Sequence, residues 1–168
     1  MVEIDIPRSN IVYAEEKLKK ASIRISLVSS KFGFERKRIL IGYIGERIVM
    51  DFLKISKDSD NYDYDLISKK GNKIEVKTIS CKSKPKMNYL CTVNSHDSNS
   101  MHKQKADVYI FTRILNDYSK GWILGWITCD YFFKKGKFIK KGTSFGNFKF
   151  IRTNATVLPI NELNPLTK

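Results

Sequence analysis

A predicted β-hairpin constrains the fold of this chain more than any other feature of the sequence. Residues 62–67 (Tyr-Asp-Tyr-Asp-Leu-Ile) and 73–79 (Lys-Ile-Glu-Val-Lys-Thr-Ile) alternate in character and are rich in β-forming side chains. Residues 69–71 (Lys-Lys-Gly) suit a three-residue loop that ends on a left-handed glycine. This loop places Asp65 opposite Glu75, with Cβ atoms about 5 Å apart. A bulge at the glycine would shift the register by one residue.

The alternation also divides the second strand into two faces. Glu75 and Lys77 share one face, because successive strand residues point to opposite sides. The other face carries the apolar or β-branched residues Ile74, Val76 and Thr78, and we expect it to face the core. Asp65 and Glu75 repel each other across the hairpin unless a cation or a lysine lies between them. The hairpin therefore predicts one core-facing side and one side that concentrates charge.

Residues 38–54 predict an amphipathic helix that carries a third carboxylate. Apolar residues recur there at steps of three and four, at Ile41, Ile44, Ile48 and Phe52. Glu46 lies at the edge of this stripe, where an acid either reaches solvent or turns into a pocket. Gly42 and Gly45 each lower helix stability by up to ~1 kcal/mol relative to alanine. We expect these glycines to allow close approach of the helix to a strand or a ligand.

Glu46, Asp65, Glu75 and Lys77 together predict a site for a hard cation. Carboxylate oxygens are the ligands that such cations prefer, and a bound cation can activate water. The alternative is an exposed hairpin with solvated charges and a glutamate on a helix surface.

The order Glu46, Asp65, Glu75-x-Lys77 resembles that of the PD-(D/E)xK nuclease superfamily, which includes restriction endonucleases, phage exonucleases and archaeal Holliday-junction resolvases. The resemblance covers roughly residues 38–115, and Tyr64 stands where the motif has proline. It implies an α/β fold with a restriction-endonuclease-like core, a mixed central β-sheet flanked by helices. It also implies that the three acids bind Mg²⁺, with Mn²⁺ able to substitute, and that the lysine positions or activates the attacking water.

The function implied by this resemblance is metal-dependent hydrolysis of DNA phosphodiester bonds, with an endonuclease as the expected form. A Holliday-junction resolvase is one alternative. A nucleic-acid-binding protein with an idle site on the same fold is another, and a structural protein with ordinary surface charges is a third. One active site cuts one strand, so cleavage of both strands would favour a homodimer.

The net charge supports a polyanionic partner. The 168 residues include 31 Lys and Arg against 17 Asp and Glu, which gives a formal net charge of +14. A protein this basic commonly binds nucleic acid; an anionic membrane surface or a generally basic proteome are the alternatives. We expect DNA as the partner and one domain over residues 1–168.

The sequence also predicts a cytoplasmic protein. It contains no stretch near the ~20 apolar residues of a membrane span, and no signal peptide is visible at the N-terminus. Its cysteines, Cys81, Cys91 and Cys129, are widely spaced and odd in number, which favours reduced thiols over a zinc site or disulfides. The lysine-, isoleucine- and asparagine-rich composition suggests an AT-rich genome such as that of a virus.

Basic residues concentrate in two segments outside the predicted catalytic core. Residues 131–161 contain no acid, and their cations include Lys134, Lys135, Lys137, Lys140 and Lys141. Lys82, Lys84 and Lys86 follow the strand of Glu75 and would flank the scissile phosphate. We expect both groups to contact DNA phosphates, and we include Gln104 as an accessory polar residue. The alternatives are a solvated loop for the second group and a surface helix position for Gln104.

The remaining pattern predicts how the domain is completed. Residues 11–24 predict a helix that covers the sheet, and 89–93 predict a third strand. Residues 106–115 are strongly β-branched and aromatic, which is typical of a strand buried on both faces. Residues 122–128 predict a further strand, and the short connection between the last two implies an antiparallel pair.

Overall fold

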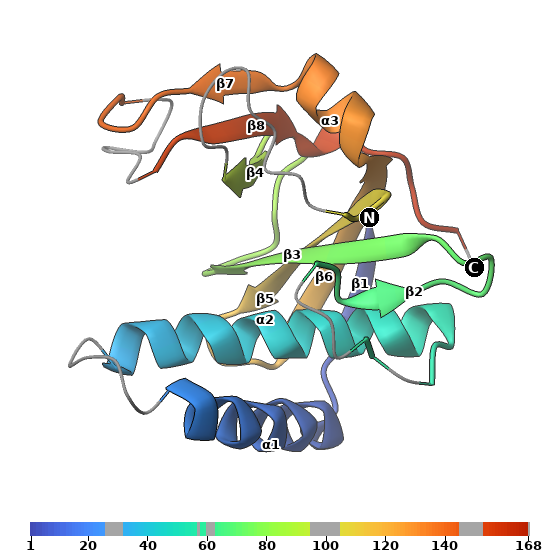
Figure 1. Ribbon diagram of the computed structural model, residues 1–168, viewed down its shortest axis with the longest axis vertical. Coiled ribbons are helices and arrows are strands. Elements are labelled where there is room, and N and C mark those ends of the chain that lie inside the picture. The colour runs from blue at the N-terminus through green and yellow to red at the C-terminus, as the bar shows by residue number, and fades with distance from the viewer. Residues whose placement is uncertain (26–31, 57, 60–62, 95–104, 145–152, 168) are drawn as a thin grey trace.

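The computed structural model has a mixed α/β fold, and its described residues form three α-helices and a curled mixed sheet. It describes the chain apart from residues 26–31, 57, 60–62, 95–104, 145–152 and 168. Figure 1 shows a layered arrangement, with α1 and α2 below the main sheet and a second, smaller sheet above it. No helix within the described part of the chain is long and apolar enough to cross a membrane.

The main sheet has five strands in the order β1-β6-β5-β3-β2. β3 pairs with β5 in parallel, and the other neighbours are antiparallel. The predicted antiparallel pair of strands is confirmed in β5 and β6, and β5 is largely buried on both faces. The strands are β1 (Val2–Asp5), β2 (Leu66–Ile67), β3 (Lys73–Cys81), β5 (Val108–Leu115) and β6 (Lys120–Thr128).

The predicted hairpin register is confirmed. Leu66 pairs with Ile74 and Ile67 pairs with Lys73, the register that brings Asp65 level with Glu75. The loop closes on Gly71, whose φ of 85° lies in the left-handed region that glycine adopts without steric cost. β2 is shorter than the predicted strand over 62–67, since only Leu66 and Ile67 pair with β3, and residue 62 lies outside the described residues.

Helix α2 (Phe32–Leu53) lies across one face of the main sheet and begins earlier than the predicted helix over 38–54. A Cβ atom at Gly45 would collide with the hydroxyl of Thr78 on β3, so glycine is what lets the helix come this close. Gly42 has no such neighbour, since nothing lies within 4 Å of its would-be Cβ. The predicted close approach is therefore confirmed for Gly45 alone.

The first core lies between α2 and the main sheet. Ile44 and Ile48 of the helix pack with Ile74 and Val76 of β3, and with Ile110 of β5. This confirms that the apolar face of the hairpin faces the core. Helix α1 (Arg8–Ile25) packs against α2 on the outside of the molecule, so it covers the helix rather than the sheet (Figure 1).

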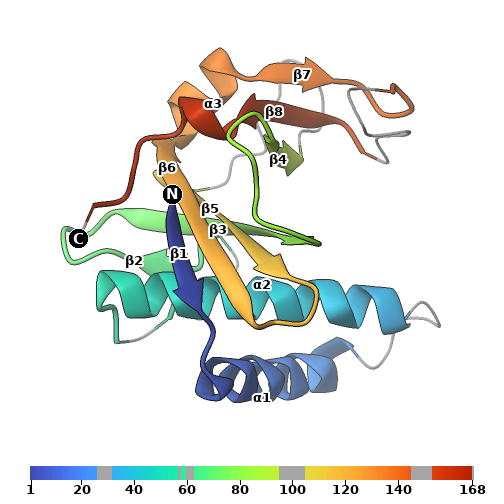
Figure 2. The ribbon, with the colours of Figure 1, turned by 180° about the vertical axis from the view of Figure 1, so that it is seen from behind.

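The opposite face of the main sheet is covered by a second sheet, which the sequence pattern did not predict. This sheet has the order β4-β8-β7, formed by β4 (Leu90–Asn94), β7 (Lys137–Ile139) and β8 (Ala155–Pro159). The predicted third strand is β4, and it belongs to this second sheet. Helix α3 (Cys129–Lys135) and the short 3-10 helix η1 (Ile160–Glu162) complete the layer, which Figure 2 shows from behind. A second core of Tyr109, Phe111, Trp122, Phe132 and Leu158 joins it to the main sheet.

Candidate active site

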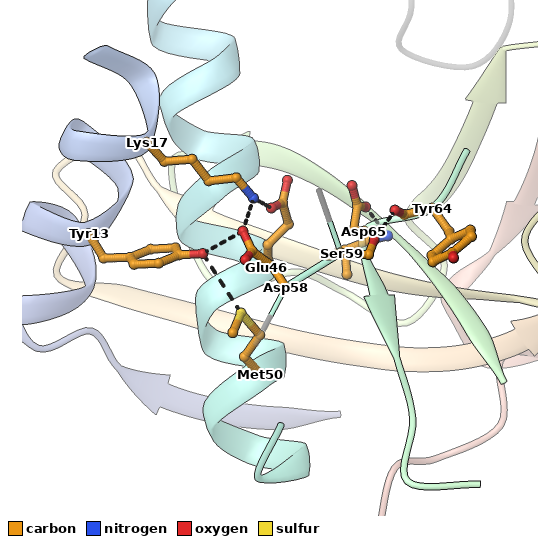
Figure 3. Close-up of polar contacts among 9 residues, drawn as sticks. Tyr13, Lys17, Glu46, Met50, Asp58, Ser59, Tyr64 and Asp65 are labelled. Atoms are coloured by element: carbon orange, nitrogen blue, oxygen red, sulfur yellow. Dashed lines mark hydrogen bonds and ion pairs between the residues drawn. The ribbon is translucent and has the colours of Figure 1, made fainter. Parts of the chain in front are cut away.

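Asp65 lies just before β2 begins, level with Glu75 on β3. The chain before β2 folds back on itself: the backbone N–H of Ser59 donates to the carbonyl of Asp65, and the Ser59 hydroxyl donates to the carbonyl of Tyr64 (Figure 3). Asp65 then turns its carboxylate toward β3, where Oδ2 accepts the backbone N–H of Val76 at 2.7 Å. The carboxylate thus satisfies a strand-edge donor that β2 no longer reaches.

Glu75 and Lys77 lie on the predicted common face of β3. Lys77 Nζ is 2.6 Å from Glu75 Oε1, and it lies 5.9 Å from the centre of the Tyr109 ring. Tyr109 in turn packs edge-on against Phe132 and Phe133 of α3. The charged pair is therefore next to the second layer of the molecule.

Glu46 reaches the site from α2 and is only 7% exposed. Burial raises the pKa of its carboxyl group, because charge is less favourable away from water. The neighbouring Lys17 opposes this rise, whereas Asp58 and Glu75 add to it. Glu46 is thus the predicted helix glutamate that turns inward.

Asp65 shows that the three predicted carboxylates act on one another. Burial raises its pKa to about 8, and the charges of Glu46 and Glu75 reinforce the rise. The Val76 N–H and the Lys77 ammonium oppose it. Residues from a helix and from both sides of a hairpin therefore form one electrostatic cluster.

Three further residues in this cluster were missed by sequence reasoning. Lys17 of α1 lies with Nζ 2.7 Å from Glu46 Oε2 and 2.7 Å from Asp58 Oδ2. The Tyr13 hydroxyl donates to the same Asp58 oxygen at 2.9 Å. Figure 3 shows Tyr13 and Lys17 reaching across from α1 to α2 and to the segment before β2. The only sequence signal for these two residues is their spacing of four, which puts them on one helix face.

The donor set suits a hard divalent cation. Its carboxylate oxygens are the ligands that Mg²⁺ prefers, and a cation would relieve the repulsion from Glu46 and Glu75, which adds to the effect of burial on the pKa of Asp65. Among the residues that the structure describes, no three Asp, Glu, His or Cys side chains converge as a ready-made metal cage. Glu46 and Glu75 instead each contact a lysine. Metal binding by all three acids therefore requires some carboxylates to turn.

The predicted DNA-contacting lysines occupy two separate places. The first group lies on α3, on β7 and in the turn after β7, and all five side chains are exposed: Lys134, Lys135, Lys137, Lys140 and Lys141. Lys82, Lys84 and Lys86 are also exposed, but Lys84 lies 3.5 Å from Glu3 of β1, at the far edge of the main sheet from β2. Gln104 lies outside the described residues.

No protein-family model matches this sequence, and the search of curated proteins finds no match either.

Proposed function

We propose that this protein is an Mg²⁺-dependent deoxyribonuclease built on a restriction-endonuclease-like core. The observation that carries the proposal is the electrostatic cluster of Glu46, Asp65 and Glu75 beside Lys77, in which the pKa of Asp65 rises to about 8. Such strong perturbation by burial and like charges is typical of functional sites. Mn²⁺ is expected to replace Mg²⁺, because both are octahedral cations with oxygen ligands.

Each residue has a defined task in this reaction. Asp65 and Glu75 would hold the cation, with Glu46 completing the set of oxygen ligands. When bound, the cation polarises the phosphate and lowers the pKa of water. Lys77 provides an ammonium group that orients the attacking water and stabilises negative charge on the phosphate oxygens. The ring of Tyr109 restricts where that ammonium lies.

The basic layer formed by α3 and β7 would bind the DNA backbone. Its lysines are exposed and follow directly after Phe132 and Phe133, whose rings pack on Tyr109. Contacts between these lysines and phosphates would give affinity without sequence preference. The layer meets Tyr109 on the side of the main sheet that carries Lys77, as contact of one duplex with both regions would require.

A DNA-binding protein with an idle site is the second candidate. It is favoured by the two short ion pairs, 2.7 Å for Lys17 with Glu46 and 2.6 Å for Lys77 with Glu75. These lysines already neutralise carboxylates that a metal ion would otherwise need. The two candidates differ in whether Mg²⁺ displaces the lysines from the carboxylates.

A cleavage assay separates the candidates. End-labelled linear, circular, single-stranded and branched DNAs are incubated with Mg²⁺, Mn²⁺ or EDTA. We expect metal-dependent cutting that Lys77→Ala lowers by ~10²-fold or more. Lys69→Ala, in the exposed hairpin loop, is the matched control and should cut like the wild type.

The pattern of products defines the outcome. Cutting of circular DNA identifies an endonuclease, and paired cuts in both strands or across a junction point to a homodimer. Binding that weakens with salt, without cutting on any substrate, would replace the nuclease by the idle-site candidate.

A further inference from the structure

We propose that Lys17 serves as a built-in cation that limits this site to one divalent metal ion per chain. The proposal rests on the metal-dependent function above and deepens it. Metal-assisted phosphodiester hydrolysis can use one or two ions. In this protein, the position beside Glu46 where a second ion would bind is held by the ammonium group of α1.

The ammonium of Lys17 lies in a pocket of groups that favour a cation. Its Nζ is 2.7 Å from one oxygen each of Glu46 and Asp58. It also lies 4.8 Å from the centre of the Tyr43 ring, a distance at which an aromatic face attracts positive charge. Asp58 is fixed in place by the hydroxyl of Tyr13. Two carboxylates and an aromatic ring thus surround one positive charge.

This arrangement is connected to the proposed metal ligands through Glu46. The carboxylate of Glu46 contacts Lys17, and the negative charge of Glu75 acts on it as well. Glu46 is therefore attracted by the lysine and repelled by the carboxylates of the hairpin. Asp58, by contrast, is held by Lys17 and Tyr13, on the side toward α1.

The formal charges of the cluster also match a single divalent ion. When Glu46, Asp58, Asp65 and Glu75 are all ionised, four negative charges face the two ammonium groups of Lys17 and Lys77. The remaining charge of minus two is balanced by one Mg²⁺ or Mn²⁺. Without Lys17, the excess rises to minus three, and Glu46 and Asp58 keep two oxygens around the vacated position.

The distances indicate that a metal ion could occupy that position after a small adjustment. Mg²⁺ binds oxygen at about 2.0–2.1 Å, so each carboxylate would move inward by roughly 0.6 Å from its place beside the ammonium. Such a shift lies within the range of ordinary side-chain rotation. Lys17 is therefore an obstacle to a second ion because of its charge and its position together.

Counting bound Mn²⁺ by equilibrium dialysis at pH 8 tests the proposal. We expect one ion per chain in the wild type and two in Lys17→Met, which keeps an unbranched side chain one atom shorter and removes the charge. Lys17→Arg keeps the charge and should retain one ion. Lys20→Met removes an exposed lysine from the same helix and should also retain one.

A double variant identifies where the additional ion binds. Lys17→Met combined with Asp58→Asn removes one carboxylate together with the ammonium, so the count should return to one. Circular dichroism of each variant verifies that it is folded. Two ions in the wild type would overturn the proposal whether or not Lys17→Met folds.

The outcomes separate this proposal from the function on which it rests. A wild type that binds no Mn²⁺ would remove the metal-dependent function and with it the one-ion limit. One ion in the wild type together with one in folded Lys17→Met would leave the nuclease intact and overturn the role of Lys17. A second ion in Lys17→Met that disappears in the double variant would support it.

Discussion

The carboxylate cluster and the basic layer on the other side of Tyr109 use charge in opposite ways. In the cluster, Glu46 and Glu75 each lie within 2.7 Å of a lysine, and the groups are largely removed from water. In the basic layer, Lys134, Lys135, Lys140 and Lys141 are exposed, and no acid in the described part of the chain forms an ion pair with them. In one region lysines are paired with carboxylates at short range, and in the other the lysines are exposed and lack such partners among the described residues.

This difference suits the carboxylate cluster to the proposed reaction and the basic layer to the proposed binding of DNA. A charge in a low-dielectric site interacts strongly with its near neighbours, so small displacements change pKa and metal affinity. An exposed charge is screened within about 10 Å at 0.1 M salt but still attracts a polyanion. Mutations in the cluster should therefore change stability and catalysis, whereas mutations in the basic layer should change DNA affinity alone.

The largest effect on stability is expected from the pH dependence of Asp65. The pKa of Asp65 in the folded state is about 8, above the ordinary aspartate value of 3.8. Between pH 3.8 and pH 8 the folded protein therefore holds a proton on Asp65 that the unfolded chain has lost. Stability without metal should therefore fall as pH rises through this window. Each pKa unit corresponds to about 1.4 kcal/mol. Allowing for partial exposure, we expect a loss on the order of 3 kcal/mol between pH 5 and pH 8.

Urea unfolding of the wild type and of Asp65→Asn checks this expectation. Asn cannot ionise, yet its side-chain oxygen can still accept the Val76 N–H, so the variant should be more stable at pH 8 and less dependent on pH. Mg²⁺ should restore stability to the wild type at pH 8 and much less to the variant. Equal pH profiles for the two proteins would show that Asp65 is not the titrating group.

A smaller loss is expected when the lysine in the cluster is removed. Lys17→Met leaves Glu46 and Asp58 without their shared cation, and breaking a well-buried pair costs ~3–5 kcal/mol. Because the side chains of Lys17 and Asp58 are each 22% exposed, we expect about 2 kcal/mol in metal-free urea unfolding. Lys20→Met, on the exposed side of α1, should change stability by less than about 0.5 kcal/mol. Similar losses in both variants would contradict the contrast between paired and exposed lysines.

The smallest effect on stability, but a large one on DNA binding, is expected in the basic layer. Replacing Lys134, Lys135, Lys140 and Lys141 by alanine should leave the urea midpoint nearly unchanged or raise it slightly, since like charges are removed. The slope of log affinity against log salt should decrease by about 0.9 for each phosphate that the variant no longer neutralises. Fluorescence anisotropy with a labelled duplex measures this slope. An unchanged slope would place the DNA on another surface.

The rate at which bound DNA is cut also distinguishes the carboxylate cluster from the basic layer. At saturating DNA, the four-alanine variant should cut at close to the wild-type rate, because the groups around Asp65 remain in place. Lys77→Ala should instead bind normally and fail to cut. A four-alanine variant that binds well and cuts slowly would mean that the basic layer also positions the scissile phosphate.

The sequence by itself determined the local parts of this molecule. The loop ending at Gly71 set the hairpin register, and strand alternation put Glu75 and Lys77 on one face. The helical period placed Glu46 at the edge of an apolar stripe. These features depend on turn geometry and side-chain period within a few residues, which is why local pattern sufficed to predict them.

Only the tertiary structure decided which distant residues complete the site. Lys17 lies 29 residues before Glu46, and nothing in the local pattern connects them. The same holds for β4, whose alternation predicts a strand but not that its partner is β8, more than sixty residues later. The physical reason is that the sequence pattern of one element shows which of its faces is apolar. Which other element packs on that face, and which charge pairs with a buried carboxylate, depends on burying all apolar faces and pairing all buried charges in one fold.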